Sequence, residues 1–231
     1  MKKILLIILG IVLVAGCTKD DKANETNADS GETNADSGTS IKIGTQTWTP
    51  KNLDLAIYND GTPIPQVTDP TAWSKLTTGA WCYYANNSAN GPIYGKLYNW
   101  YAVAGIHDND PNTPYKILAP NGWHVPLDAE LTTLITYLGG ESIAGGKMKA
   151  ATLWFSPNAG ANNSSSFTAL PGGYCDYNGM FQDIGKYGSW WSSSEKDNDN
   201  AWYFDMFYDQ VFVEHYSSNK YLGLSVRCLK D

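Results

Sequence analysis

The chain has 231 residues, of which 42% are hydrophobic, 17% charged and 13% aromatic, and its net charge is −7. This length allows one large domain or two small ones, and the composition excludes a coiled coil, a helical bundle and a largely disordered chain. Residues 41–231 carry twelve basic and seventeen acidic side chains, without any basic run. Because phosphate binding depends on clustered basic residues, nucleic acid is not expected as a partner.

The start of the chain predicts an export signal followed by a lipid anchor. A positive pair, Lys2 and Lys3, precedes an apolar stretch over residues 4–14. This stretch is shorter than the roughly 20 residues of a membrane-spanning helix and is typical of a secretory signal peptide. The segment Val14-Ala15-Gly16-Cys17 resembles the bacterial lipobox, which implies cleavage after residues 1–16 and lipidation of the new N-terminal cysteine. The lipid would make the membrane a partner; a signal peptide that merely contains a cysteine is the alternative.

Residues 17–40 are expected to form a flexible acidic tether between the lipid and the domain. The heptapeptide Glu-Thr-Asn-Ala-Asp-Ser-Gly occurs twice in succession, over residues 25–31 and 32–38, and the tether holds no large apolar residue. A random coil of this length spans roughly 25–30 Å. Lys19 and the two acids after it resemble the export signal of surface lipoproteins in Bacteroidota, which predicts a lipoprotein of the outer membrane exposed at the cell surface. An ordinary charged tether is the alternative.

The first half of the domain is expected to contain short strands separated by loops. Residues 41–44 and 45–48 predict two strands around a glycine turn. Residues 58–79, rich in Pro, Thr, Asp and Gly, predict a long loop, and the aromatic segment 80–84 predicts a strand. Residues 94–105 place apolar side chains at i, i+3, i+4 and i+7, which predicts a short buried helix.

The second half is expected to contain the main helices and most of the strands. Residues 128–138 predict the best helix, with four apolar side chains on one face and a Gly-Gly stop. A weaker helix is expected over residues 143–151. Residues 122–125 predict a short extended segment. Strands are expected over residues 167–170, 188–192, 202–208, 211–216 and 222–229, with a hairpin turn at Asp209-Gln210.

Several motifs, in this order along the chain, resemble the Fibrobacter succinogenes major paralogous domain family. The resemblance covers about residues 41–231 and implies an α+β domain with a C-type-lectin-like fold, similar to that of the formylglycine-generating enzymes. Such a domain has two helices, a small mixed and mostly antiparallel sheet, long loops, and N- and C-terminal strands that lie close together; the resemblance implies little about activity. The motifs include Ile43-Gly44-Thr45-Gln46-Thr47-Trp48, Trp81-Cys82-Tyr83-Tyr84, Gly95-Lys96-Leu97-Tyr98-Asn99-Trp100, Gly122-Trp123-His124-Val125-Pro126 and Ser225-Val226-Arg227-Cys228.

The chain departs from the family pattern at two positions. Leu127 stands where the family usually has Thr or Ser before the main helix, so the helix lacks its usual hydroxyl cap. This loss costs about 0.5–2 kcal/mol unless another group caps the helix. Cys175 stands where the family more often has Arg.

Three cysteines lie in the domain, and exported proteins tend to pair their cysteines. The family resemblance implies a cysteine in both the Trp-Cys-Tyr-Tyr and the Val-Arg-Cys motifs, so Cys82 and Cys228 are the expected disulfide. Cys175 would then be the more reactive thiol if any of the three is exposed. Three reduced, buried thiols are the alternative.

No residue pattern indicates catalysis, and the domain is expected not to be an enzyme. The paired cysteines of the formylglycine-generating enzymes have no counterpart, and the histidines lack metal-ligand spacing. His124 is expected to be a structural hydrogen-bonding residue, and Arg227, the only arginine, to form an ion pair inside the fold. The acidic segment 195–200 offers oxygen ligands of the kind that Ca²⁺ prefers, but a solvated turn is the favoured interpretation, so no cofactor is expected.

The strand over residues 202–208 is aromatic on both of its faces. One face must be core; the other could be an exposed platform for sugars or peptides, with Tyr203 and Phe207 as candidate ligand contacts. A strand buried on both faces is the alternative. The leading hypothesis is therefore a non-catalytic, lectin-like binding domain for a glycan or protein ligand. An enzyme of the formylglycine-generating branch and a purely structural envelope protein are the alternatives.

Overall fold

The computed structural model describes residues 40–231. The expected signal peptide, the lipid-acceptor Cys17 and all of the tether except Ser40 lie outside the described residues. None of the helices within residues 40–231 is long and apolar enough to cross a membrane. The predicted α+β class is confirmed, because a few helices and several small antiparallel sheets make up this part of the chain.

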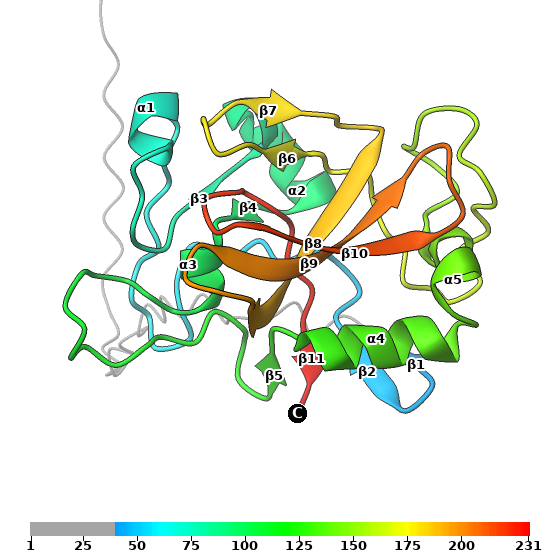
Figure 1. The fold of residues 1–231 in the computed structure, drawn as a ribbon, viewed down its shortest axis with the longest axis horizontal. Helices are drawn as coiled ribbons and strands as arrows, with labels where there is room; N and C mark the ends of the chain where they lie inside the picture. Colours follow the sequence, from blue (N-terminus) through cyan, green and yellow to red (C-terminus); the bar gives the residue numbers. More distant parts are fainter. Residues whose placement is uncertain (1–39) are drawn as a thin grey trace, which may run out of the picture. The chain divides into compact units, whose positions relative to one another are not determined.

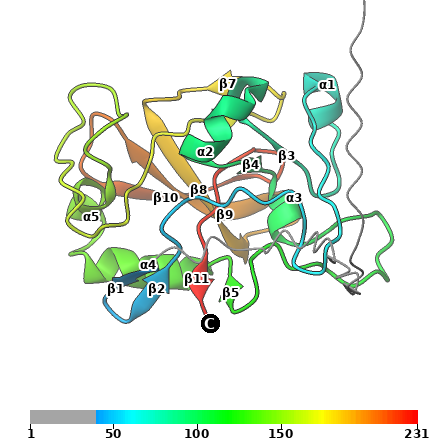
Figure 2. The same ribbon diagram turned by 180° about the vertical axis from the view of Figure 1, so that it is seen from behind.

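A four-stranded sheet joins the two ends of the domain (Figures 1 and 2). The first hairpin pairs β1 (Ile41–Ile43) with β2 (Gln46–Trp48), and Gly44 turns it with a φ of +62°. Strand β11 (Leu229–Lys230) then lies between β2 and β5 (Trp123–His124), antiparallel to both. The predicted hairpin and the predicted extended segment near residue 123 are both confirmed.

The main sheet consists of three long antiparallel strands in the order β10-β9-β8. They are β8 (Tyr187–Glu195), β9 (Asn200–Phe207) and β10 (Val213–Asn219), close to the predicted positions. Residues 208–212 connect β9 to β10, so the predicted hairpin exists with a longer connection than Asp209-Gln210 alone.

The two longest helices cover one face of this sheet, as Figure 1 shows. Helix α4 (Asp128–Tyr137) packs against β8, and α5 (Glu141–Met148) packs against β10. Their apolar faces enclose the larger core, because leucines every three to four residues on α4 meet the inward side chains of the sheet. The buried residues at this interface include Leu131, Leu134, Ile135, Met148, Trp190, Phe204, Met206 and Val213.

A second core lies against part of the opposite face of the sheet. Neighbours on β8 show the division, since Trp190 belongs to the first core and Trp191 to the second, and both are fully buried. Short elements build this side: β3 (Trp81–Cys82) pairs with β4 (Leu97–Tyr98), and β6 (Tyr174–Cys175) pairs with β7 (Phe181–Gln182). Residues 223–225 link these pieces through single bridges to Tyr98, Cys175 and Trp190.

The predicted helix over residues 94–105 is wrong as a single element. Helix α2 (Gly91–Tyr94) ends at Gly95, whose φ is +75°, and β4 follows before α3 (Trp100–Val103) begins. The side chain of Asn99 caps α3 by accepting a hydrogen bond from the Ala102 N–H at 3.0 Å. A glycine stop and a fresh N-cap thus override the apolar spacing.

The remaining elements are short and lie among the loops. They are α1 (Pro70–Trp73) and the 3-10 turns η1 (Tyr84–Asn86) and η2 (Ser88–Asn90). The strands predicted over residues 167–170 and 222–229 reduce to isolated bridges and to β11, because successive residues bond to different elements and no continuous ladder forms.

Candidate functional site

The face of the main sheet that is turned away from α4 and α5 carries a cluster of aromatic rings around two acids. Because side chains alternate along a strand, Phe204 and Met206 point into the first core, whereas Tyr203, Asp205 and Phe207 point to the other side. The strand register places Ser189 and Glu214 on either side of Asp205. We name this cluster the tyrosine face; its rings are Tyr174, Tyr187, Tyr203, Phe207 and Tyr216.

The rings of the tyrosine face come from four strands, β6, β8, β9 and β10, and contact one another in two groups. Tyr187 and Phe207 meet edge-on with centroids 4.8 Å apart, and Tyr187 also meets Tyr174 at 6.3 Å. Tyr203 contacts Tyr216 at 6.1 Å. Tyr203 and Phe207 are half-buried, while Tyr216 is 43% exposed.

The structure therefore brings the two predicted ligand contacts, Tyr203 and Phe207, onto one face. The alternative was a strand buried on both faces. This describes β9 only near Ala201, where the second core covers the sheet. Tyr174, Tyr187 and Tyr216 were not predicted. The alternation within β9 could identify its own rings, but the register between strands is needed for Tyr187 and Tyr216, and the bridge of Gly173 to Gly188 for Tyr174.

Asp205 lies beneath these rings and is 6% exposed. Burial raises the pKa of its carboxyl to about 7; the side chains of Ser189 and Tyr203 hydrogen-bond to it and oppose this rise, while the nearby Glu214 adds to it. Its Oδ1 atom is buried without a hydrogen-bond partner. Glu214 accepts a hydrogen bond from the Tyr216 hydroxyl. The face thus combines aromatic rings with one buried and one more accessible carboxylate.

A cavity of about 510 Å³ lies elsewhere, against the chain that follows β2. Its one acidic side chain, Asp54, is paired with Lys96 Nζ at 2.6 Å. Prolines and exposed Ile93 give the cavity an apolar wall. The lining includes Thr49, Pro50, Asn52, Leu53, Asp54, Pro92, Ile93 and Trp123.

The acidic segment 195–200 forms the turn between β8 and β9. Lys220 pairs with Glu195 and donates a hydrogen bond to the Asn198 carbonyl at 2.7 Å. Asp197 accepts backbone N–H groups from Asp199 and Asn200 at 3.0 and 2.9 Å. The Lys220 ammonium group and the loop's own amides therefore already bond to Glu195 Oε1, the Asn198 carbonyl and Asp197 Oδ1. Within residues 40–231, no three His, Cys, Asp or Glu side chains are grouped to hold a metal ion.

The expected disulfide between Cys82 and Cys228 is not formed in the structure. All three cysteines of the domain are free thiols and are buried, as in the expected alternative of three reduced, buried thiols. Cys82 hydrogen-bonds with Cys175 and shares a small core cluster with it, while Cys228 belongs to the second core. The reason is strand pairing: β11, which follows Cys228 directly, bonds to β2 and β5 and not to β3.

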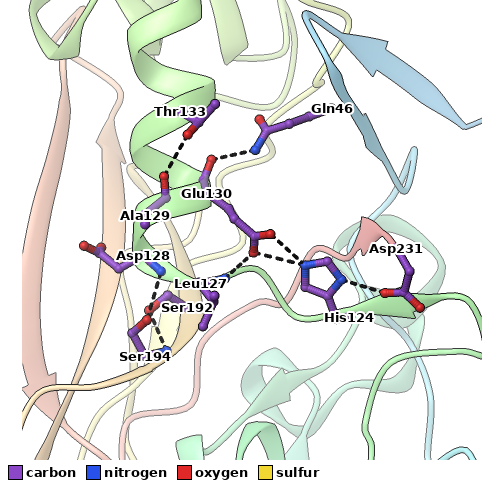
Figure 3. Close-up of polar contacts among 10 residues, drawn as sticks. All are labelled: Gln46, His124, Leu127, Asp128, Ala129, Glu130, Thr133, Ser192, Ser194 and Asp231. Carbon is purple, nitrogen blue, oxygen red and sulfur yellow. Dashed lines mark hydrogen bonds and ion pairs between the residues drawn. The ribbon is translucent and has the colours of Figure 1, made fainter.

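His124 links three segments through hydrogen bonds, as predicted for a structural residue (Figure 3). Its Nδ1 lies 2.7 Å from Asp231 Oδ1, and its Nε2 lies 3.0 Å from Glu130 Oε2. Burial alone would lower the pKa of His124, but the hydrogen bonds and charges of Asp231 and Glu130 together raise it above the ordinary value.

The missing hydroxyl cap of α4 is supplied by the main sheet (Figure 3). Ser194 Oγ on β8 accepts the Asp128 N–H at 3.0 Å, and the Glu130 carboxylate accepts the Leu127 N–H at 2.8 Å. The Glu130 carbonyl in turn accepts a hydrogen bond from Gln46 Nε2 at 2.8 Å. The helix start is therefore tied to β8, to the first hairpin and to His124.

Arg227 does not form the ion pair expected of it. Among the ion pairs of residues 40–231, none involves Arg227; its Nη2 donates to the Phe167 carbonyl at 2.6 Å and its guanidinium lies 4.3 Å from the Phe167 ring centre. Burial lowers the pKa of this guanidinium. Arg227 is thus a packing residue of the core rather than a ligand contact.

Comparison with known proteins identifies a family but no individual relative. The family model described as the Fibrobacter succinogenes major domain matches residues 41–230. No curated protein and no solved structure matches the chain.

Proposed function

The chain belongs to the Fibrobacter succinogenes major domain family, and from this premise we propose that it is a surface lipoprotein whose lectin-like domain binds a carbohydrate. Lipidated Cys17 anchors the chain in the outer membrane, and residues 17–40 hold the domain away from the lipid. The domain has no catalytic role in this proposal. The tyrosine face is the binding surface.

The observation that carries this proposal is the placing of rings around carboxylates on one face. Aromatic rings pack against the apolar C–H faces of sugars, and carboxylates accept hydrogen bonds from hydroxyl groups. Tyr203, Phe207 and Tyr216 supply the rings, and Glu214 supplies the more accessible carboxylate. No metal ion is needed for this mode of binding.

Two features support the lectin-like interpretation of the fold. The first hairpin and the last strand are neighbours, since Trp48 of β2 pairs with Leu229 of β11. Two helices, α4 and α5, pack on a small antiparallel sheet, and long loops complete the domain. Both features match what the family resemblance implies.

A protein ligand is the second candidate, and the position of β10 favours it. β10 is an edge strand of the main sheet, and an extended peptide can add to such an edge through its backbone. Exposed Tyr216 would then contact the side chains of the peptide.

Binding to a glycan array, followed by titration calorimetry on the strongest glycan, tests the proposal with detergent-solubilised, full-length protein. Tyr203→Ala and Phe207→Ala should each weaken binding by tenfold or more, because each ring covers one side of a sugar. Ile93→Ala in the separate cavity is the matched control and should bind like the wild type. Loss of binding in Ile93→Ala alone would move the site to the cavity, and binding only to immobilised peptides would favour the protein ligand.

Protease treatment of intact cells tests the surface location. The domain should be degraded without breaking the cells, whereas a periplasmic control protein should survive. Replacing Lys19, Asp20 and Asp21 with Ala should protect the domain without preventing lipidation. Equal protection of the wild type would contradict the surface location.

A further inference from the structure

Two of the three thiols in the domain face each other in a small buried cluster. Cys82 and Cys175 are each 1% exposed and share this cluster with Trp73, Ala80 and Leu97. A hydrogen bond joins their side chains. Cys228 is fully buried in a different cluster, so it serves as an internal comparison.

A glycine gives Cys175 the space to reach this cluster. Cys175 and Gly223 exchange two backbone hydrogen bonds, of 2.9 and 2.8 Å. A Cβ atom on residue 223 would lie 2.9 Å from the Cys175 Cβ and 2.9 Å from the Trp73 ring, closer than real side chains approach. Gly223 therefore leaves room for the Cys175 side chain beside Trp73. Cys82, on β3, lies in the same buried cluster.

We propose that Cys82 and Cys175 form a disulfide bond in the exported protein, while Cys228 stays a thiol. The proposal rests on export, because disulfides persist in oxidising compartments outside the cytosol. A disulfide needs two cysteine side chains that meet at short range, and Cys82 and Cys175 meet within one buried cluster. Cys228 lacks this requirement, since the contact partner of Cys82 is Cys175.

The reaction is a thiol–disulfide exchange with a low-molecular-weight disulfide as the oxidant. One protein thiol loses its proton and attacks the donor, which forms a mixed disulfide and releases one donor thiol. The second protein thiolate then attacks the mixed disulfide and releases the other donor thiol. In sum, two protein S–H bonds are replaced by one S–S bond, and the donor disulfide is reduced to two thiols.

Burial determines when this exchange takes place. Burial raises the pKa of Cys82, so little thiolate is present in the folded domain, and external reagents cannot reach either sulfur. We therefore expect the bond to form while the chain folds, and to form slowly once the domain is closed.

Refolding in a glutathione redox buffer tests the proposal independently of membrane anchoring. The full chain with Cys17→Ser, which removes the fourth cysteine, is refolded from denaturant, denatured again, alkylated with N-ethylmaleimide, digested and analysed by mass spectrometry. One alkylated cysteine, Cys228, and a linked peptide pair containing Cys82 and Cys175 are expected. Three alkylated cysteines, or a link that includes Cys228, would overturn the proposal.

Two further variants separate the bond from effects on folding. Cys228→Ala should keep the linked peptide pair, whereas Cys175→Ala should yield two alkylated cysteines. Because the bond closes a loop of roughly 90 residues, reduction should lower the melting temperature by about 10 °C in Cys228→Ala and leave Cys175→Ala unchanged. An equal response of both variants would contradict the assignment. The two proposals can fail separately. Absence of the linked peptides would not contradict sugar binding, and absence of sugar binding would not contradict the disulfide.

Discussion

Ser194 on β8 caps helix α4 by accepting the Asp128 N–H at 3.0 Å. The helix has a leucine at its own N-cap position, so the hydroxyl comes from a residue far along the chain rather than from the residue before the helix. The cap thereby joins the main helix to the main sheet. Its loss should affect the stability of the domain and not only of the helix.

Replacing Ser194 with Ala should reduce the free energy of unfolding by about 0.5–2 kcal/mol, because the Asp128 N–H would lose its partner. Urea unfolding measures the change. Ser193→Ala on the same strand is the matched control and should cost less, since only its backbone is used, in a bond to the Pro126 carbonyl. Equal losses in the two variants would contradict the capping role.

His124 should make stability depend on pH in a defined direction. Its pKa in the folded domain lies above the ordinary value of 6.5, because Asp231 and Glu130 stabilise the charged ring. The stabilisation is therefore complete below about pH 6.5 and is lost as the pH rises through the folded pKa. Urea unfolding from pH 5.5 to 8.5 should show a smaller decline in His124→Gln than in the wild type, with His107→Gln as control. If the free energy of unfolding changes with pH in the same way in His124→Gln and in the wild type, the predicted contribution of His124 is wrong.

Asp205 should also lower stability as the pH rises, but over a lower range. Its pKa rises from 3.8 to about 7 on folding, so the folded state favours the neutral acid. Stability therefore falls between about pH 4 and pH 7 and is level above that range. Asp205→Asn should remove this decline and be more stable at pH 8, by up to about 4 kcal/mol. Asp183→Asn is the control; an unchanged decline in Asp205→Asn would contradict the burial argument.

Cys17→Ser should abolish lipidation and release the protein from membranes, because serine has no thiol to accept the lipid. Labelling with a radioactive fatty acid and detergent phase partitioning measure both effects. Cys228→Ala should keep the label and the membrane location. Label retained by Cys17→Ser would show that the lipobox interpretation is wrong.

Local sequence patterns could predict the regular parts of the fold. The first hairpin follows from alternating residues around Gly44, and α4 follows from leucines at helical spacing before a Gly-Gly stop. The long strands β8, β9 and β10 follow mainly from their aromatic content. The prediction of a helix over residues 94–105 failed because Gly95 ends one helix and Asn99 begins another. The spacing of apolar residues alone does not show where a helix is interrupted.

Contacts between distant short segments could not be predicted in the same way. The thiol pair depends on the bridge of Cys175 to Gly223, and a single bridge carries no sequence period. For the same reason, Tyr203 and Phe207 were identifiable from alternation in one strand, whereas Tyr187 and Tyr216 needed the pairing register. The capping role of Ser194 could not be predicted, because Ser194 lies far along the chain from helix α4 and meets it only in the folded domain.

The placement of residues 223–230 has a consequence for biogenesis. This short segment bridges to β4, β6 and β8, and its last strand lies between β2 and β5. Contacts so distant in sequence are slow to form, and a chain emerging from the ribosome cannot make them until this segment has been synthesised. The growing domain would therefore stay open until this segment has been synthesised. A translocase that accepts only unfolded chains would gain time from this delay.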